Sequence, residues 1–258
     1  VQQNRDSETF RLFEALNWYK LPLQHAQLYH FLKGKFLYAI DSAVAVGHWQ
    51  QAASVQGEFQ AHARYSIMLD KLYRSDIKGV LELLDVLQSD KRYEALCVYP
   101  RALSTALLGD TMKALTIIDS NIDRPEVQGK LSLSILGMQL SYRLGLPVRY
   151  ARLLQLSAGY GYQRGSVDTL RLAQMYSLVM AWDTVTLLLK KTDHWPDSIK
   201  ALSYFEQGNA WLAWGLDEKL DRYLARARSS FQRVTELEVS GKMRERAFYL
   251  YAKLCYEI

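Results

Sequence analysis

The chain has 258 residues, of which 49% are hydrophobic and 23% charged, and its net charge is +5. This balance excludes an intrinsically disordered chain, and the lack of any uncharged apolar run of about 18 residues predicts that no segment spans a membrane. The mild basic surplus favours an acidic partner, but it is not by itself the signature of a nucleic-acid-binding protein.

Nearly every segment carries apolar residues at spacings of three and four, and no segment alternates as a half-buried strand does. The pattern predicts an all-α protein, and the short connections predict that successive helices form antiparallel pairs. The expected helices cover residues 7–18, 22–33, 35–46, 48–60, 61–74, 76–88, 91–108, 110–122, 129–144, 147–157, 167–180, 182–192, 197–214, 218–238 and 242–257.

Small residues recur in the first helix of successive pairs. They lie 35, 36 and 35 residues apart, at Ala102, Gly137, Ala173 and Gly208. Glycine inside a helix costs about 1 kcal/mol relative to alanine. We therefore expect another helix to lie against the backbone at Gly208, and we expect leucine there to overpack the contact at a cost of about 1–3 kcal/mol.

The second helices repeat a pattern of their own, a small residue followed one turn later by a large one, as in Ala227 and Phe231. This arrangement resembles the tetratricopeptide (TPR) repeat, a helix-turn-helix unit of about 34 residues. The resemblance is clearest over residues 95–257 and faint over 35–90. It implies a TPR-like α-solenoid of antiparallel helix pairs, coiled as a right-handed superhelical stack.

On this basis we expect an N-terminal helical cap over residues 1–34 and a single continuous domain of TPR-like repeats over residues 35–258. Two features depart from the family pattern. Pro100 falls inside an expected first helix, and the segment LDEKLDR lengthens the expected turn after Gly215.

Residues for catalysis or metal binding are sparse. The five histidines lack metal-ligand spacing, so we interpret most of them as surface or packing residues. Cys97 and Cys255 lie far apart in apolar helical surroundings, which predicts buried thiols and favours the cytoplasm over the periplasm without settling the compartment. We predict no enzyme activity, no cofactor and no metal. Because the first residue is valine, we also expect the chain to be an excised or processed form.

The segment GYGYQRG at residues 159–165 superficially resembles a glycine-rich phosphate loop. Its spacing, G-x-G-x-x-x-G between two helices, does not match the dinucleotide fingerprint, which requires G-x-G-x-x-G after a strand. We interpret it as a turn between repeats. Its Tyr160, Tyr162 and Arg164 are candidate contact residues, because tyrosine and arginine are enriched at interface hot spots.

A basic cluster follows near the C-terminus, and its members are Arg222, Arg226, Arg228, Arg233, Lys242, Arg244 and Arg246. Acidic residues are interspersed among them, so a solvated face crossed by salt bridges is favoured over a phosphate-binding stripe. Only Tyr223 offers an obvious aromatic partner for a base. Nucleic acid is therefore an unlikely ligand.

The TPR resemblance also implies a binding groove along the first helices. The candidate groove residues are Gln174, Phe205, Asn209 and Leu212. In that family an asparagine directly after the small residue often hydrogen-bonds the bound peptide, and GNAW at Asn209 resembles that pattern. No accompanying lysine or arginine is evident, and a solvated polar residue is an equally good interpretation of Asn209.

Three functions remain open. The leading one is a non-enzymatic scaffold or chaperone-like adaptor, plausibly bacterial, that binds a protein or peptide partner in its groove. The second is a regulatory or sensing domain of a larger protein, such as a bacterial transcription regulator. The third is an enzyme whose site is assembled from distant residues. The sequence leaves the oligomeric state open.

Overall fold

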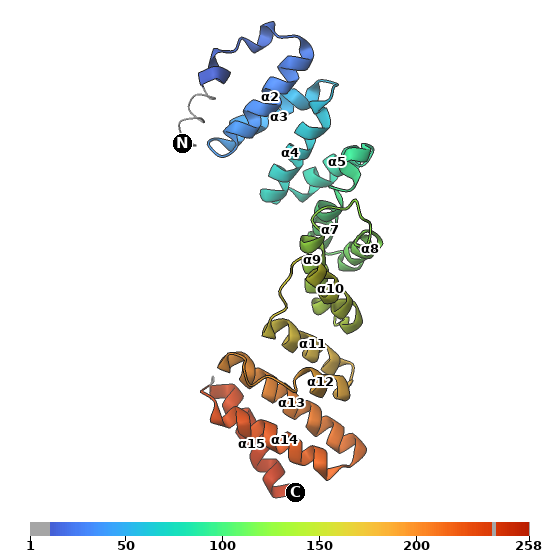
Figure 1. Ribbon diagram of the computed structural model, residues 1–258, viewed down its shortest axis with the longest axis vertical. Helices are drawn as coiled ribbons and strands as arrows, with labels where there is room; N and C mark the ends of the chain where they lie inside the picture. The colour runs from blue at the N-terminus through green and yellow to red at the C-terminus, as the bar shows by residue number, and fades with distance from the viewer. Residues whose placement is uncertain (1–10, 239–240, 258) are drawn as a thin grey trace. The chain divides into compact units, whose positions relative to one another are not determined.

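The computed structural model describes residues 11–238 and 241–257, and within these ranges it contains helices and no strand (Figure 1). Residues 11–15 are helical as well. The helices are η1 (Trp18–Lys20), α2 (Leu23–Leu37), α3 (Ser42–Ser54), α4 (Phe59–Tyr73), α5 (Ile77–Leu87), α6 (Lys91–Glu94), α7 (Val98–Leu107), α8 (Thr111–Asn121), α9 (Lys130–Arg143), α10 (Pro147–Gly159), α11 (Ser166–Leu178), α12 (Trp182–Leu188), α13 (Asp197–Glu218), α14 (Asp221–Glu236) and α15 (Gly241–Glu257). The expected all-α fold is confirmed.

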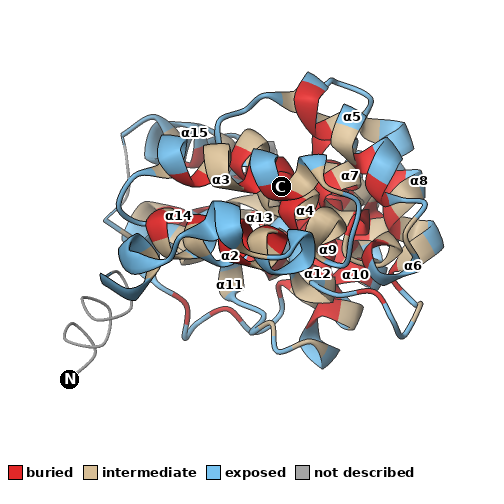
Figure 2. Cartoon of the chain, turned by 90° about the horizontal axis from the view of Figure 1, so that it is seen from above, coloured by how far each residue is buried: buried red, intermediate tan, exposed pale blue. Residues whose placement is uncertain are grey.

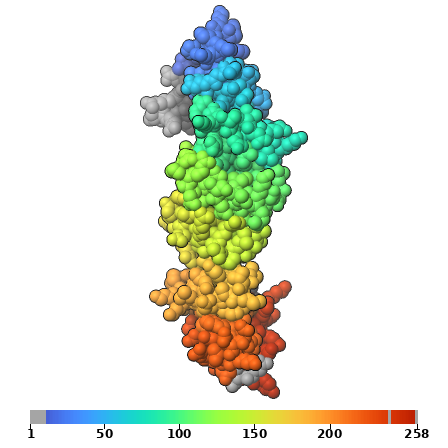
Figure 3. Space-filling view, turned by 90° about the vertical axis from the view of Figure 1, so that its right-hand side faces the viewer, coloured from blue at the N-terminus to red at the C-terminus, as the bar shows by residue number. Residues whose placement is uncertain are grey.

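The chain forms two compact units, Val1–Leu133 and Ser134–Ile258. Within each unit, helices contact their neighbours along the chain, as the successive colour bands of Figure 3 show. The first helix of one pair also contacts the first helix of the next, as α2 does with α4 and α11 with α13. This stacking of consecutive pairs is the pattern of a helical repeat.

The buried residues of each unit are mostly apolar and lie between neighbouring helices. Figure 2 shows the buried segments in red and the exposed ones in pale blue. In unit 2, one cluster joins α11, α12 and α13 around Ala173, Val185 and Ala210. A second cluster joins α13, α14 and α15 around Phe231 and Leu254. The long helix α13 therefore contributes to both clusters, because it packs against α11 and α12 and also against α14 and α15.

The four periodic small residues are all buried. At Gly208, an added Cβ would lie 2.6 Å from Cε1 of Phe231 on α14, which is too close for any real Cβ contact. The expected close approach of the paired helix at Gly208 is therefore present. Because the phenyl ring fills this space, packing outweighs the low helix propensity of glycine.

The first helix pair differs from the sequence expectation, which broke helices near residues 34 and 47. Both Gly34 and Gly47 lie inside helices, and the real break falls before α3, whose N-cap is Asp41. The Asp41 carboxylate accepts hydrogen bonds from the backbone N–H groups of Ala43 and Val44. The expected boundary between the cap and the repeats lies within α2, and that division stays a prediction.

Two other helix boundaries also differ. The expected helix 91–108 is divided into α6 and α7, so Pro100 lies in the first turn of α7, where proline is tolerated. The first three residues of the extra segment LDEKLDR, 216–218, extend α13 to Glu218, so the segment does not form a long turn. Lys219 then ends the helix in a left-handed conformation, with φ of 54°.

The two cysteines lie in different environments. Cys97 is buried as expected, and burial raises its pKa to about 11. Cys255 is exposed on α15, so the expectation of a buried thiol is wrong there. Apolar helical periodicity predicts burial only where a following element covers the helix face, and part of this last helix stays open to solvent.

Candidate functional site: an aromatic pocket on helices α12 to α14

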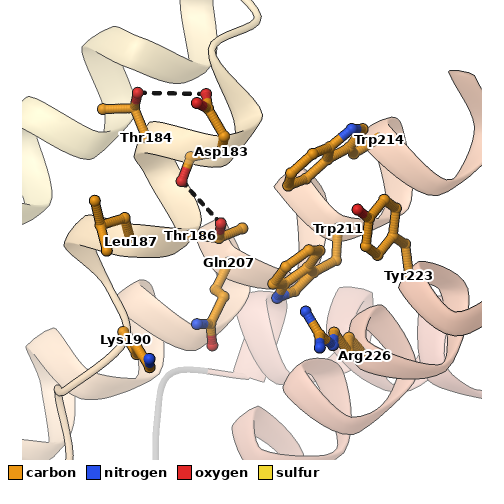
Figure 4. Close-up of a pocket in the computed structure, with 10 residues that line it drawn as sticks. All are labelled: Asp183, Thr184, Thr186, Leu187, Lys190, Gln207, Trp211, Trp214, Tyr223 and Arg226. Atoms are coloured by element: carbon orange, nitrogen blue, oxygen red, sulfur yellow. Dashed lines mark hydrogen bonds between the residues drawn. The ribbon is translucent and has the colours of Figure 1, made fainter. Parts of the chain in front are cut away.

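A pocket of about 560 Å³ lies between α12, α13 and α14 in unit 2 (Figure 4). Its lining residues are Asp183, Thr184, Thr186, Leu187, Lys190, Gln207, Trp211, Trp214, Tyr223 and Arg226. This volume is in the range that holds a small molecule or one or two side chains of a partner. Helix α12 spans only seven residues whereas α13 spans 22, so the shorter helix leaves part of the longer one uncovered.

Three aromatic side chains form one wall of the pocket. The indole rings of Trp211 and Trp214 are parallel within 1°, with their centroids 5.4 Å apart. Tyr223 packs against both, with its ring centroid 5.1 Å from that of Trp211 and 4.5 Å from that of Trp214. The three rings are half-buried. They support one another and still present apolar surface to the pocket.

Arginines from α14 lie over this wall. The guanidinium carbon of Arg226 is 4.7 Å from the Trp211 ring centroid, and that of Arg222 is 5.0 Å from the Tyr223 centroid. Both arginines are exposed, and neither has a carboxylate within ion-pair distance in the described part of the chain. Stacking leaves the N–H edges of a guanidinium available to an acceptor.

The opposite side of the pocket is formed mainly by α12 and the residues that follow it. Leu187 is 72% exposed there, which is unusual for a large apolar side chain beside a pocket, and Lys190 is exposed as well. Asp183 is the acidic residue among the lining side chains, and it accepts a hydrogen bond from the Thr184 hydroxyl at 3.3 Å. The lining therefore combines apolar surface with two cations and one anion.

Gln207 links the three helices at this pocket. Its Nε2 donates to the Leu189 carbonyl just after α12 at 3.5 Å, and its Oε1 accepts from the Ser230 hydroxyl on α14 at 3.5 Å. The amide of Gln207 thus connects the end of α12 with α14 and helps to position the pocket residues between them.

The expected groove residues do not line this pocket: three lie elsewhere on α13 and one lies on α11. Phe205 packs against Phe231, with ring centroids 5.8 Å apart, and Leu212 joins the same cluster between α13, α14 and α15. Asn209 is half-buried, and its side chain has no hydrogen bond within the described residues. On α11, Gln174 accepts a hydrogen bond from the Tyr142 hydroxyl at 3.4 Å. The role of these four residues in binding stays a prediction.

The candidate contact loop is largely tied to its own unit. The hydroxyl of Tyr162 donates to both carboxylate oxygens of Asp168, at 3.0 and 3.1 Å, and Arg164 donates to Thr169 at 3.0 Å. Burial and this hydrogen bond raise the pKa of Tyr162, so its phenol stays a proton donor. Tyr160 is half-buried. Among the three, Arg164 is the most accessible to a partner.

The basic cluster differs from the expected salt-bridged face. Arg233 is paired with Asp193 at 4.0 Å, but Arg222 and Arg226 lie on aromatic rings instead. Arg246 likewise lies over Phe205, at 5.6 Å. The sequence singles out Tyr223 but does not predict that Trp211 and Trp214 pack against it, because those two residues come from the preceding helix. Their spacing of three on α13 was the available signal.

Histidines approach each other once in unit 1. Nδ1 of His30 lies 2.9 Å from Nδ1 of His48, and the two rings stack at 5.2 Å. Burial, together with the positive charges of His48 and Lys33, lowers the pKa of His30 to about 4. In residues 11–238 and 241–257, no three His, Cys, Asp or Glu side chains are grouped as metal ligands, and no helix is long and apolar enough to cross a membrane.

Comparisons with known proteins found similar solved structures. The chain is similar to a tetratricopeptide repeat protein from Parabacteroides merdae, with 14% sequence identity and a TM-score of 0.47. The match covers 90% of this chain and 86% of that one. No family model and no curated protein matches the sequence.

Proposed function

We propose that the protein is a non-enzymatic interaction module, a scaffold or adaptor, that binds a peptide segment of a protein partner through the pocket on α12, α13 and α14. The observation that carries the proposal is the half-buried aromatic wall of Trp211, Trp214 and Tyr223 beside the exposed Leu187. Aromatic residues and arginine dominate the energy of protein interfaces, and an apolar pocket with a polar rim is the usual seat of an anchor side chain.

A selection from a library of short random peptides displayed on phage, with the full chain as the target, tests this proposal. We expect enriched peptides to carry an apolar or aromatic anchor. Replacing Trp214 with leucine should weaken their binding by about thirtyfold, since central aromatic residues contribute about 2 kcal/mol or more at interfaces. Fluorescence anisotropy of a labelled enriched peptide gives the dissociation constant.

Tyr256 provides the matched control, because it is 94% exposed on α15 and does not line the pocket. The Tyr256→Leu variant should bind the peptide with unchanged affinity. If no sequence is enriched, or if the Trp214→Leu variant binds as tightly as the original chain, the proposed site is wrong.

A further inference from the structure

The arginines of α14 and the aromatic residues of α13 form two successive pairs. Arg226 lies 4.7 Å from the Trp211 ring centroid, and Arg233 lies 5.2 Å from that of Tyr204. Trp211 follows Tyr204 by seven residues on α13, and Arg226 precedes Arg233 by seven on α14. Seven residues are about two helical turns, so in antiparallel helices the same arrangement repeats along one interface.

The pair at Tyr204 already holds a carboxylate. Asp193, in the connection before α13, lies 4.0 Å from Arg233 and accepts a hydrogen bond from the Tyr204 hydroxyl. The hydrogen bond to Asp193 adds to the effect of burial in raising the pKa of Tyr204, so the phenol remains a donor to the carboxylate. In this chain, an arginine stacked on a ring of α13 therefore lies beside a carboxylate, which the Tyr204 hydroxyl holds in place.

The pair at Trp211 repeats the arginine and the ring, with an indole in place of the phenol and without the carboxylate. Arg226 and its neighbour Arg222 are exposed and have no acidic partner among the residues that the structure describes. Lys190 adds a third exposed cation on the α12 side of the pocket. A carboxylate placed between the aromatic wall and these cations would receive a forked, charge-assisted hydrogen bond from a guanidinium.

We infer that the pocket on α12, α13 and α14 binds an acidic peptide segment of a protein partner, with a carboxylate on Arg226 and an adjacent apolar side chain between Leu187 and Trp214. The inference rests on the proposed function and specifies the chemistry of the partner. Charge complementarity selects the occupant, because the aromatic wall supplies apolar contact area while Arg222, Arg226 and Lys190 select against basic segments.

Single-stranded nucleic acid is the other ligand that stacked aromatics and arginines fit. The pocket favours the peptide because its cations are local and do not form a track for successive phosphates. Arg233, farther along the same face, is already paired with Asp193.

The experiment compares three probes with the full chain by fluorescence anisotropy: an acidic peptide enriched in the selection, the same peptide with every Asp and Glu changed to Asn and Gln, and oligothymidylate. We expect the amide peptide to bind about tenfold more weakly than the acidic one. Raising the salt concentration should weaken the acidic peptide's binding, because exposed charges are screened.

Variants locate the effect. Arg226→Gln should weaken binding of the acidic peptide by about tenfold and leave binding of the amide peptide nearly unchanged. Arg226→Lys should recover part of the affinity, since it keeps the charge but loses the fork. Arg228→Gln is the matched control, because a side chain two residues further on α14 points to the opposite side of the helix.

The possible failures can be told apart. Enrichment of neutral or basic peptides whose binding Trp214→Leu abolishes would overturn the acidic partner and leave the proposed function standing. Tighter binding of oligothymidylate than of the acidic peptide would overturn the choice of a protein partner. Equal effects of Arg226→Gln and Arg228→Gln would overturn the placement of the carboxylate.

Discussion

Two helical hairpins, one in each unit, use the same packing device. On α2, Gly34 lies beneath Trp49 of α3, and on α13, Gly208 lies beneath Phe231 of α14. An added Cβ at Gly34 would lie 2.5 Å from Cδ1 of Trp49, and one at Gly208 would lie 2.6 Å from Cε1 of Phe231. In both hairpins, an aromatic ring of the second helix fills the space left by the missing side chain.

The hairpins differ in what could move to make room. At Gly34 the added Cβ would also lie 2.9 Å from the backbone carbonyl oxygen of Ala45, and the Trp49 indole is held by its N–H, which donates to the Phe31 carbonyl at 3.3 Å. At Gly208 the three nearest atoms all belong to the Phe231 ring, which has no polar atom to fix it. The first contact is therefore limited by the backbone and the second by a side chain.

The largest expected effect is that of Gly34→Ala. The methyl group must push both the fixed indole and the α3 backbone, so we expect a loss of about 3 kcal/mol from the hairpin, at the upper end of overpacking costs. Amide hydrogen exchange in α2 and α3 measures this loss locally, which matters because a chain of two units need not unfold in one step.

Gly47→Ala is the matched control on α3, because an added Cβ at Gly47 meets no atom within 4 Å. We expect it to stabilise α3 slightly, by up to about 1 kcal/mol, through the higher helix propensity of alanine. Equal exchange rates in the Gly34→Ala and Gly47→Ala variants would show that the close approach at Gly34 does not limit the hairpin.

Gly208→Ala should cost less, about 1–2 kcal/mol, because the Phe231 ring can tilt away. The double variant with Phe231→Leu tests this cause. The smaller side chain should reduce the cost of the added methyl group, so the two changes should be non-additive by about 0.5 kcal/mol or more in exchange measurements on α13 and α14. Additive losses would show that Phe231 is not the obstacle.

Much of this comparison could be predicted from the sequence. The interval of about 35 residues locates the tight contact at Gly208. It does not locate the one at Gly34, because glycine is compatible with a helix interior and with a helix break, and the sequence pattern favours a break there. Only tertiary contact distinguishes them, since the indole of Trp49 lies fifteen positions along the chain from Gly34. The sequence does not predict the candidate pocket for a similar reason, because its lining residues come from three helices, α12, α13 and α14.

The first hairpin also differs from the second in its polar neighbours, and this difference makes it sensitive to acid. His30 has a pKa lowered from 6.5 to about 4, so the folded state binds its proton more weakly than the unfolded chain does. The stability that neutral His30 contributes is fully present above pH 6.5 and is lost as the pH falls towards 4. We expect a loss of up to about 2 kcal/mol by pH 5, measured by exchange in α2 and α3.

Burial is the main cause of this loss, and the pairing of His30 with His48 adds to it. One imidazole must accept a hydrogen bond from the other, so protonating the acceptor breaks the contact at 2.9 Å. The positive charge of Lys33 nearby also disfavours protonation of His30. The His48→Gln variant should lose less stability on acidification than the original chain. His25→Gln, which replaces an exposed histidine of α2, should keep the original acid response. Identical acid responses in all three proteins would contradict this account.

The smallest expected effect concerns Asn209, on the second hairpin. Asn209 lies on the side of α13 opposite Gln207, in line with Leu202 and Leu216 two turns away, which are 41% and 63% exposed. We predict that Asn209→Ala leaves the fold intact, because its side chain makes no hydrogen bond among the described residues, and weakens peptide binding by about threefold, the value of one neutral hydrogen bond. Anisotropy measurements against the exposed control Ser229→Ala test this. A partner that loses affinity with both Asn209→Ala and Trp214→Leu must contact two sides of α13, whereas unchanged affinity for Asn209→Ala removes this residue from the site.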